Sequence, residues 1–170
     1  TEFKTIKKTL AMKTGVNKSV AECPLRETFQ GNLEDQWTST NPASGMIWEI
    51  VELGANKALY VDAFSNTDLD DQSWLVSPVL DLTNIDEASL TYDMSYAFRD
   101  GTSDVFMILA STDCGNTFTD TLYVSAGSCL SDGMNSGESW EPCCDVDWTN
   151  NSLVLSSLVG KPDVRIAFVF

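Results

Sequence analysis

From residue 24 onward, the chain is a series of short apolar segments separated by turns, and this pattern is the strongest constraint on its fold. Glycine, asparagine, aspartate and proline lie between the segments, and these residues favour turns. Residues 88–98 (ASLTYDMSYAF) alternate apolar and polar side chains, as a strand with one exposed face does. The series predicts an all-β protein, a two-sheet antiparallel β-sandwich whose long connections favour a jelly roll.

The first residues differ in composition from the rest, because half of the ten basic residues are lysines within the first 18 positions. In residues 2–14 (EFKTIKKTLAMKT), Phe3, Ile6 and Leu10 recur at helical spacing with lysines on the other face, and Gly15 follows as a stop. This spacing predicts a short N-terminal helix. A membrane-binding amphipathic helix is the alternative, but one turn of apolar face gives it little support.

The change in composition also predicts how the chain is divided. Residues 1–22 are expected to be a helix and linker that end a preceding domain. Residues 23–170 are expected to form the β-sandwich. The chain stops within an apolar segment, residues 164–170, so we expect the C-terminal strand to be truncated.

The charge of the chain argues against some partners. Its net charge is −15 at pH 7, from 25 acidic and 10 basic residues with no histidine. An acidic surface repels phosphate backbones, so nucleic acid is not an expected partner. The same surface attracts divalent cations or keeps an exported domain soluble. No apolar stretch is long enough to span a bilayer, so membrane insertion is not expected.

The absence of histidine removes most catalytic sites. A Ser-His-Asp triad, a Cys-His pair and an HExxH zinc helix all require it. Acidic pairs occur at positions 70–71, 86–87 and 145/147, but a glycosidase needs two carboxylates that face each other across a cleft. Adjacent acids in turns are usually solvated loop ends. We therefore expect no catalytic residues and no enzyme in this chain.

Oxygen ligands for calcium gather in the loop before Trp74. Calcium binds carboxylate, carbonyl and amide oxygens, which the loops of a sandwich supply readily. The loop predicts a structural calcium ion, and a solvated acidic loop without metal is the alternative. The loop residues with such oxygens are Asp62, Asn66, Asp68, Asp70 and Asp71.

Two tryptophans flank a polar loop and are candidates for ligand contact. Trp140 and Trp148 could stack on the apolar face of a sugar ring. Packing of both rings beneath the loop is the alternative. Trp48 and Trp74 lie inside strand patterns and are expected in the core.

Five cysteines, an odd number, leave at least one thiol without an internal partner. Cys143 and Cys144 are adjacent and cannot easily bond to each other, but either could reach Cys129 and close a polar loop. We predict one such disulfide, and free thiols are the alternative. No CxxC pair and no histidine are present, which argues against a structural zinc site.

Several phrases, taken in order, carry a family resemblance. They are Glu27-Thr28-Phe29-Gln30, Trp37, Trp48-Glu49, 56–61 (NKALYV), 74–82 (WLVSPVLDL), 90–98 (LTYDMSYAF), 111–115 (STDCG), Trp148 and 160–168 (GKPDVRIAF). In this order they resemble the cleaved-adhesin, or choice-of-anchor J, domains of secreted and surface proteins of Bacteroidetes, which are relatives of MAM-like jelly rolls. Residues 2–14 also resemble the last helix of a pappalysin-like metalloprotease domain.

The resemblance implies a secreted or cell-surface accessory domain that mediates adhesion or substrate targeting, in proteins exported by type IX secretion. It implies a host or environmental surface protein or glycan as partner, together with a neighbouring domain of the same polypeptide. It adds Gln30 to the calcium ligands, although the family commonly carries Phe-Glu where this chain has Phe29-Gln30. The alternatives are a carbohydrate-binding module, or a structural spacer or processing domain of a secreted metalloprotease.

Overall fold

The computed structural model describes residues 3–9, 12–13, 25–31, 37–41, 46–66, 71–131, 136, 138 and 140–170, with residues 3–9 and 12–13 as strand backbone. The strands are β1 (Phe3–Thr9), β2 (Met12–Lys13), β3 (Thr38–Thr40), β4 (Glu49–Leu53), β5 (Asn56–Asp62), β6 (Trp74–Val76), β7 (Glu87–Ser95), β8 (Val105–Ser111), β9 (Asp120–Ala126), β10 (Thr149–Val154) and β11 (Arg165–Val169). The described residues also include the short 3-10 helices η2 (Gly127–Leu130), η3 (Asp145–Asp147) and η4 (Ser156–Leu158). The described ranges contain no α-helix.

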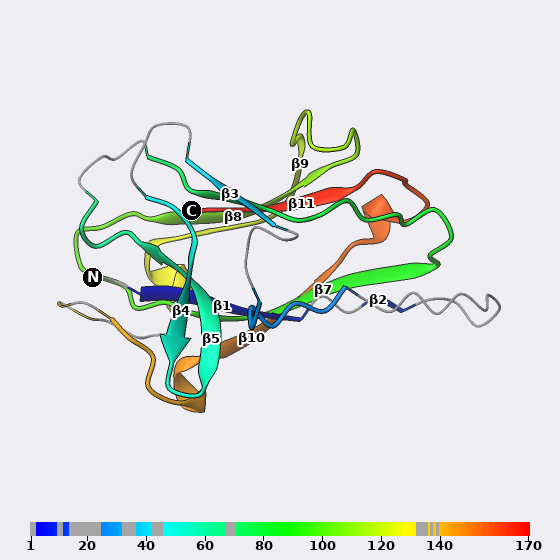
Figure 1. Ribbon diagram of the computed structural model, residues 1–170. Coiled ribbons are helices and arrows are strands. Elements are labelled where there is room, and N and C mark those ends of the chain that lie inside the picture. Colours follow the sequence, from blue (N-terminus) through cyan, green and yellow to red (C-terminus); the bar gives the residue numbers. More distant parts are fainter. Residues whose placement is uncertain are drawn as a thin grey trace.

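The strands form two antiparallel sheets that lie one above the other (Figure 1). One sheet has the order β10-β7-β1-β5-β4, and β2 also pairs with β7. The other has the order β3-β6-β11-β8-β9. The predicted all-β class with antiparallel sheets is confirmed, and jelly-roll connectivity stays a prediction.

One hydrophobic core takes side chains from both sheets. Tyr92 of β7, Phe106 of β8 and Phe168 of β11 are buried, and their ring centroids lie 6.1–6.3 Å apart. Leu90 and Tyr92 point inward in alternation with half-exposed neighbours, as predicted for this strand. Trp48 is in the core as expected and donates its indole N–H to the Ser73 carbonyl at 3.1 Å. Trp74 is half-buried in a smaller cluster against Phe118.

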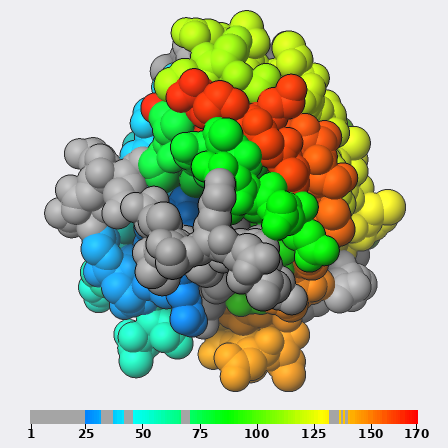
Figure 2. Space-filling view, turned by 90° about the vertical axis from the view of Figure 1, so that its right-hand side faces the viewer, coloured from blue at the N-terminus to red at the C-terminus, as the bar shows by residue number. Residues whose placement is uncertain are grey.

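The Ser77-Pro78 segment that follows β6 is hydrogen-bonded to β11. The Ser77 backbone N–H donates to the Ile166 carbonyl, and the Ser77 hydroxyl accepts the Ile166 N–H, both at 2.9 Å. Beyond it, Leu80 pairs with Val164 in an isolated bridge. Gly160 N–H then donates to the Leu82 carbonyl at 2.9 Å, so these two chain segments lie side by side at one end of the molecule (Figure 2).

The predicted N-terminal helix is wrong. Residues 3–9 form β1, the middle strand of its sheet, which pairs with β5 on one side and β7 on the other. The helical spacing of apolar residues in this segment is short and gives a helix little stability. Backbone hydrogen bonds to two neighbouring strands stabilise the extended chain more. The division between residues 1–22 and 23–170 stays a prediction. Within the described ranges, no helix is both long and apolar enough to span a membrane.

Candidate functional site

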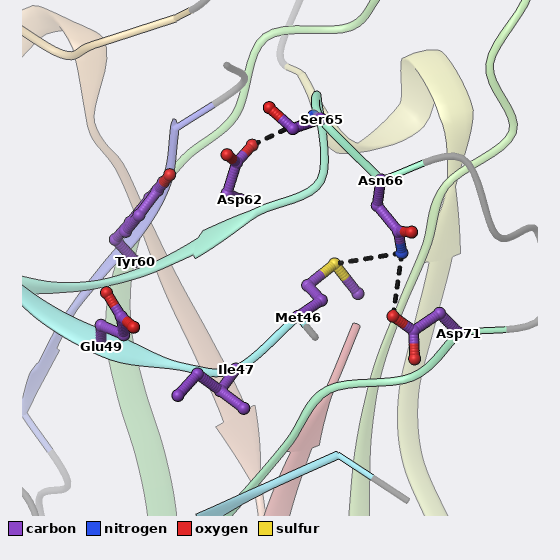
Figure 3. A pocket seen from close by; sticks show the side chains of 8 residues that line it. All are labelled: Met46, Ile47, Glu49, Tyr60, Asp62, Ser65, Asn66 and Asp71. Atoms are coloured by element: carbon purple, nitrogen blue, oxygen red, sulfur yellow. Dashed lines mark hydrogen bonds between the residues drawn. The ribbon is translucent and has the colours of Figure 1, made fainter. Parts of the chain in front are cut away.

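An acidic pocket of about 390 Å³ lies where β4 and β5 meet the loops around β6 (Figure 3). Three carboxylates line it, together with a phenol, a hydroxyl, an amide and two apolar side chains. The lining residues are Met46, Ile47, Glu49, Tyr60, Asp62, Ser65, Asn66 and Asp71.

The strand side of the pocket follows from register and alternation. Glu49 of β4 is the direct partner of Tyr60 of β5, and Asp62 follows two residues later, so Tyr60 and Asp62 share a face of the strand. The pKa of Tyr60 is raised above its ordinary value by burial, and then by the negative charges of Asp62 and Glu49 and a hydrogen bond to Asp62. The phenol therefore stays protonated, and the negative charge of the pocket comes from its carboxylates.

Hydrogen bonds within the loops hold two of these carboxylates in place. Asp62 Oδ1 accepts the backbone N–H groups of Phe64 at 3.1 Å and Ser65 at 3.2 Å. On the opposite side, Asn66 Nδ2 donates to Asp71 Oδ2 at 3.0 Å and contacts Met46 Sδ at 3.8 Å. The Asn66–Asp71 bond therefore links both ends of the loop between β5 and β6.

The chemistry of this lining suits a cation, because carboxylate, amide and hydroxyl oxygens are the ligands that hard cations prefer. These carboxylates are spread around the pocket. Among the described residues, one set of three acidic or thiol groups has all its ligand atoms within 4.8 Å of one another, and it lies elsewhere, at Cys143, Cys144 and Asp147. A cation in the acidic pocket would have to draw the loop carboxylates inward.

The structure places three residues of the predicted calcium loop in the pocket lining and leaves another predicted ligand outside it. Asp62, Asn66 and Asp71 line the pocket. Gln30 is exposed, donates its side-chain N–H to the Thr28 carbonyl at 3.1 Å, and does not line the pocket. Asp68 and Asp70 lie outside the described residues. The role of these residues as ligands stays a prediction.

Glu49 and Tyr60 are pocket residues that sequence reasoning missed. They lie in strands rather than in the acidic loop, and only the pairing of β4 with β5 puts them beside Asp62. The alternation along residues 58–62, which puts Tyr60 on the same strand face as Asp62, is a sequence signal that could have found Tyr60.

The two predicted ligand-binding tryptophans are half-buried. Trp140 donates its indole N–H to the Ser95 hydroxyl of β7 at 3.0 Å. Trp148 follows η3 and donates its backbone N–H to the Asp145 carbonyl at 3.2 Å. This burial favours the packing alternative for both rings, and ligand contact stays a prediction.

The described cysteines are exposed free thiols at positions 114, 129, 143 and 144. The predicted disulfide from Cys129 to Cys143 or Cys144 is not formed in this structure and stays a prediction. Cys23 lies outside the described residues.

The structure of the chain is similar to that of the K1 cleaved adhesin domain of Lys-gingipain from Porphyromonas gingivalis. The two share a TM-score of 0.52 at 17% sequence identity, over 82% of this chain and 85% of that one. No family model matches the chain, and no curated protein matches it. The similarity to a cleaved adhesin domain predicted from sequence is therefore confirmed at the level of the fold.

Proposed function

We propose that this chain is a non-catalytic accessory domain of a secreted or cell-surface protein, in which it mediates adhesion or substrate targeting. The observation that carries the proposal is the fold, which is similar over most of its length to a domain described as a cleaved adhesin domain. The lack of histidine supports a role in binding, because the common hydrolytic sites need that residue.

The acidic pocket is the proposed contact site. It is concave, lies between strand ends and loops, and concentrates carboxylates on one part of the surface. Surface proteins or glycans would bind across the loops that border it. The neighbouring domain of the same polypeptide is the second proposed partner.

Calcium is the proposed cation of this site. Asp62 and Asp71 would hold it, and the oxygen chemistry of the lining fits a hard cation. Asp68, Asp70 and Gln30 remain proposed further ligands. Bound calcium would neutralise the carboxylates of the pocket and tether the loop between β5 and β6 to the sheet. The ordered loop would then present a fixed surface to the partner.

A surface-binding assay tests this proposal with variants on the two strands that line the pocket, β4 and β5. Binding of the chain to immobilised extracellular matrix proteins and to a glycan panel is measured in calcium, for the wild type and for Glu49→Gln and Asp62→Asn. Glu52→Gln is the matched control, because Glu52 is exposed on the same β4 strand but does not line the pocket. We expect saturable binding that both pocket variants weaken about tenfold, or ~1.4 kcal/mol, and that the control leaves unchanged.

Two results would count against the proposal. Equal weakening by Glu49→Gln and Glu52→Gln would show an effect of net charge and not of the pocket. Absence of binding to every surface would leave the chain as a spacer or processing domain.

A further inference from the structure

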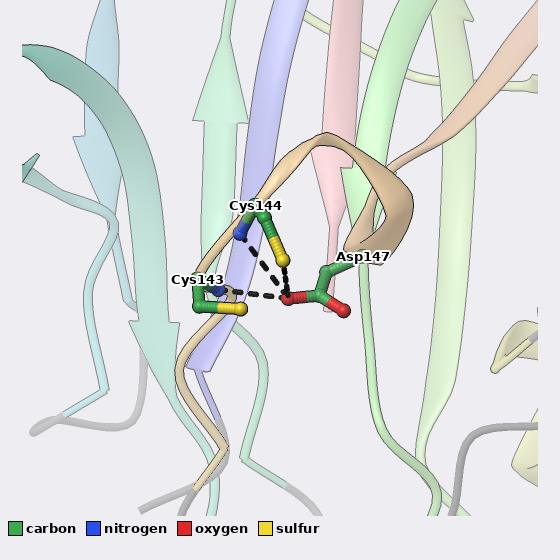
Figure 4. Close-up of side chains that lie close together, drawn as sticks. All are labelled: Cys143, Cys144 and Asp147. Carbon is green, nitrogen blue, oxygen red and sulfur yellow. Dashed lines mark hydrogen bonds between the residues drawn. The ribbon is translucent and has the colours of Figure 1, made fainter.

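Two adjacent thiols and a carboxylate converge at the start of η3 (Figure 4). The Sγ atoms of Cys143 and Cys144 and a carboxylate oxygen of Asp147 all lie within 4.8 Å of one another. Both cysteines are exposed and Asp147 is half-buried, so the group opens to solvent. The acidic pocket contains none of these residues, and the proposed function does not use them.

The local backbone explains how neighbouring cysteines can point to one place. Cys144 caps η3 in an extended conformation, and Asp147 is the third residue of that helix. Asp147 Oδ2 accepts the backbone N–H of Cys143 at 2.8 Å and that of Cys144 at 3.4 Å. The turn therefore curls around the carboxylate, and both cysteines remain free thiols.

The distances suit a tetrahedral metal ion. With zinc–sulfur bonds of about 2.3 Å and zinc–oxygen bonds of about 2.0–2.2 Å, neighbouring ligand atoms lie roughly 3.5–3.8 Å apart. Cys144 Sγ already lies 3.7 Å from Asp147 Oδ2. Cys143 Sγ lies within 4.8 Å of both of these atoms, at an exposed position.

Without a cation, the surroundings of Cys143 do not favour a thiolate. Hydrogen bonds to the Cys144 thiol first, and then to Asp147, raise the pKa of the Cys143 thiol to about 12, so this thiol stays protonated until a cation binds. Backbone N–H groups, that of Cys143 first, lower the pKa of Asp147 and keep it ionised. A divalent cation would remove the repulsion that opposes the thiolate.

We propose that Cys143, Cys144 and Asp147 bind a thiophilic divalent cation of the zinc and cadmium class. Two thiolates and one carboxylate oxygen would be the protein ligands, and a water molecule would take the fourth position. On binding, the hydrated cation loses water, each thiol releases one proton to solvent, and no atom is oxidised or reduced. Calcium is not the expected ion, because sulfur is a poor ligand for a hard cation.

This site lies outside what sequence spacing predicts. The absence of CxxC and histidine argued against zinc. The order Cys-Cys-x-x-Asp, in contrast, brings the two thiols and the carboxylate together only when a short helix follows with the second cysteine as its N-cap. The site also excludes the predicted disulfide, because a bond from Cys129 to either cysteine would remove one metal ligand.

Titration with cadmium alone tests the proposal. The full 170-residue chain is reduced with a phosphine, and Cd²⁺ is added while the thiolate-to-metal absorption and the heat of binding are recorded. We expect one Cd²⁺ per chain. Cys143→Ser and Cys144→Ser should each weaken binding by at least about tenfold. Asp147→Asn should weaken binding several-fold, because the Asn side chain loses the charge but keeps an oxygen that can accept the backbone N–H groups.

Cys23→Ser, Cys114→Ser and Cys129→Ser are the matched controls, and they should leave the affinity unchanged. Equal loss in the Cys129→Ser control would overturn the proposal, as would full binding by Cys143→Ser or no binding by the wild type. A complete disulfide from Cys129 to Cys143 or Cys144 in the chain before reduction, seen by mass spectrometry, would overturn it as well. Circular dichroism of each variant checks that the variant is folded, so that weaker binding reflects the loss of a ligand and not unfolding.

Discussion

Gly115, in the turn between β8 and β9, is constrained both by its backbone and by a neighbour. Its φ is +88°, and a Cβ atom there would lie 2.8 Å from Arg165 Cδ. Gly101 has a similar φ of +85°, and no atom lies within 4 Å of a Cβ placed there. A substitution at Gly101 therefore measures the cost of backbone strain alone. Gly101→Ala should cost about 1–2 kcal/mol, and Gly115→Ala about 1 kcal/mol more.

Chemical denaturation of both glycine variants measures this difference. Arg165 donates from Nη1 to the Ser77 carbonyl at 2.9 Å, so its displacement would also disturb the link between β6 and β11. Equal losses of stability in the two variants would contradict the predicted contact, since only the shared backbone strain would then remain.

Asp113 in the same turn makes stability depend on pH. The Ser111 hydroxyl first, and then the Thr117 hydroxyl and N–H, lower its pKa to about 2. Because the folded-state pKa lies below the ordinary value of 3.8, ionised Asp113 stabilises the fold above about pH 4, and this contribution is lost as the pH falls toward 2.

Asp113→Asn should therefore be less stable than the wild type at neutral pH. The gap in melting temperature should close as the pH falls from about 4 to 2. Thermal unfolding at several pH values measures the gap. A constant gap over that range would show that the charge of Asp113 does not hold the turn.

At the residue scale, sequence reasoning located some site residues and missed others for a physical reason. Asp62 and Asp71 were predicted because they lie in one acidic loop. Glu49 could not be predicted to join them, because its place depends on the β4–β5 register. The sequence marks Asp147 only as a member of an acidic pair with Asp145, because its approach to Cys144 depends on η3.

At the element scale, the strands with clear alternation were predicted and the first strand was not. The alternation of residues 88–98 predicts a strand there, and β7 covers residues 87–95. β1 was predicted as a helix because Phe3, Ile6 and Leu10 fit that period. Its pairing with β5 and β7 joins residues more than 50 positions apart, which local periodicity does not detect.

The position of β1 predicts the effect of removing it. Deletion of residues 1–22 would leave β5 and β7 without the strand between them and expose the unpaired backbone of both. We expect the melting temperature to fall by more than about 10 °C, or cooperative unfolding to be lost. Ile6→Pro in the full chain, which removes one donor from this central strand, should lower stability by about 3 kcal/mol.

Thermal and chemical unfolding of the two β1 variants distinguish strand from linker. If residues 23–170 unfold at the same temperature as the full chain, and Ile6→Pro is neutral, the predicted boundary at residue 22 is right and β1 adds no stability.

At the scale of the whole molecule, two antiparallel sheets enclose one core and present an acidic pocket at the ends of β4 and β5. The aromatic rings of Tyr92, Phe106 and Phe168 pack between the two sheets. The net charge of −15 opposes close approach of its carboxylates unless a cation is bound. We propose that this pocket is a cation-dependent contact site of an adhesin-like domain.

Thermal unfolding of the full chain in calcium, in EDTA and in magnesium, at constant ionic strength, tests this claim most directly. A ligand that binds only the folded state raises its stability. We predict a melting temperature several degrees higher in calcium than in EDTA, no equivalent rise in magnesium, and loss of the rise in Asp62→Asn and Asp71→Asn but not in Glu52→Gln. Identical melting temperatures of the wild type in calcium and EDTA would contradict the claim and leave the acidic loop as a solvated surface.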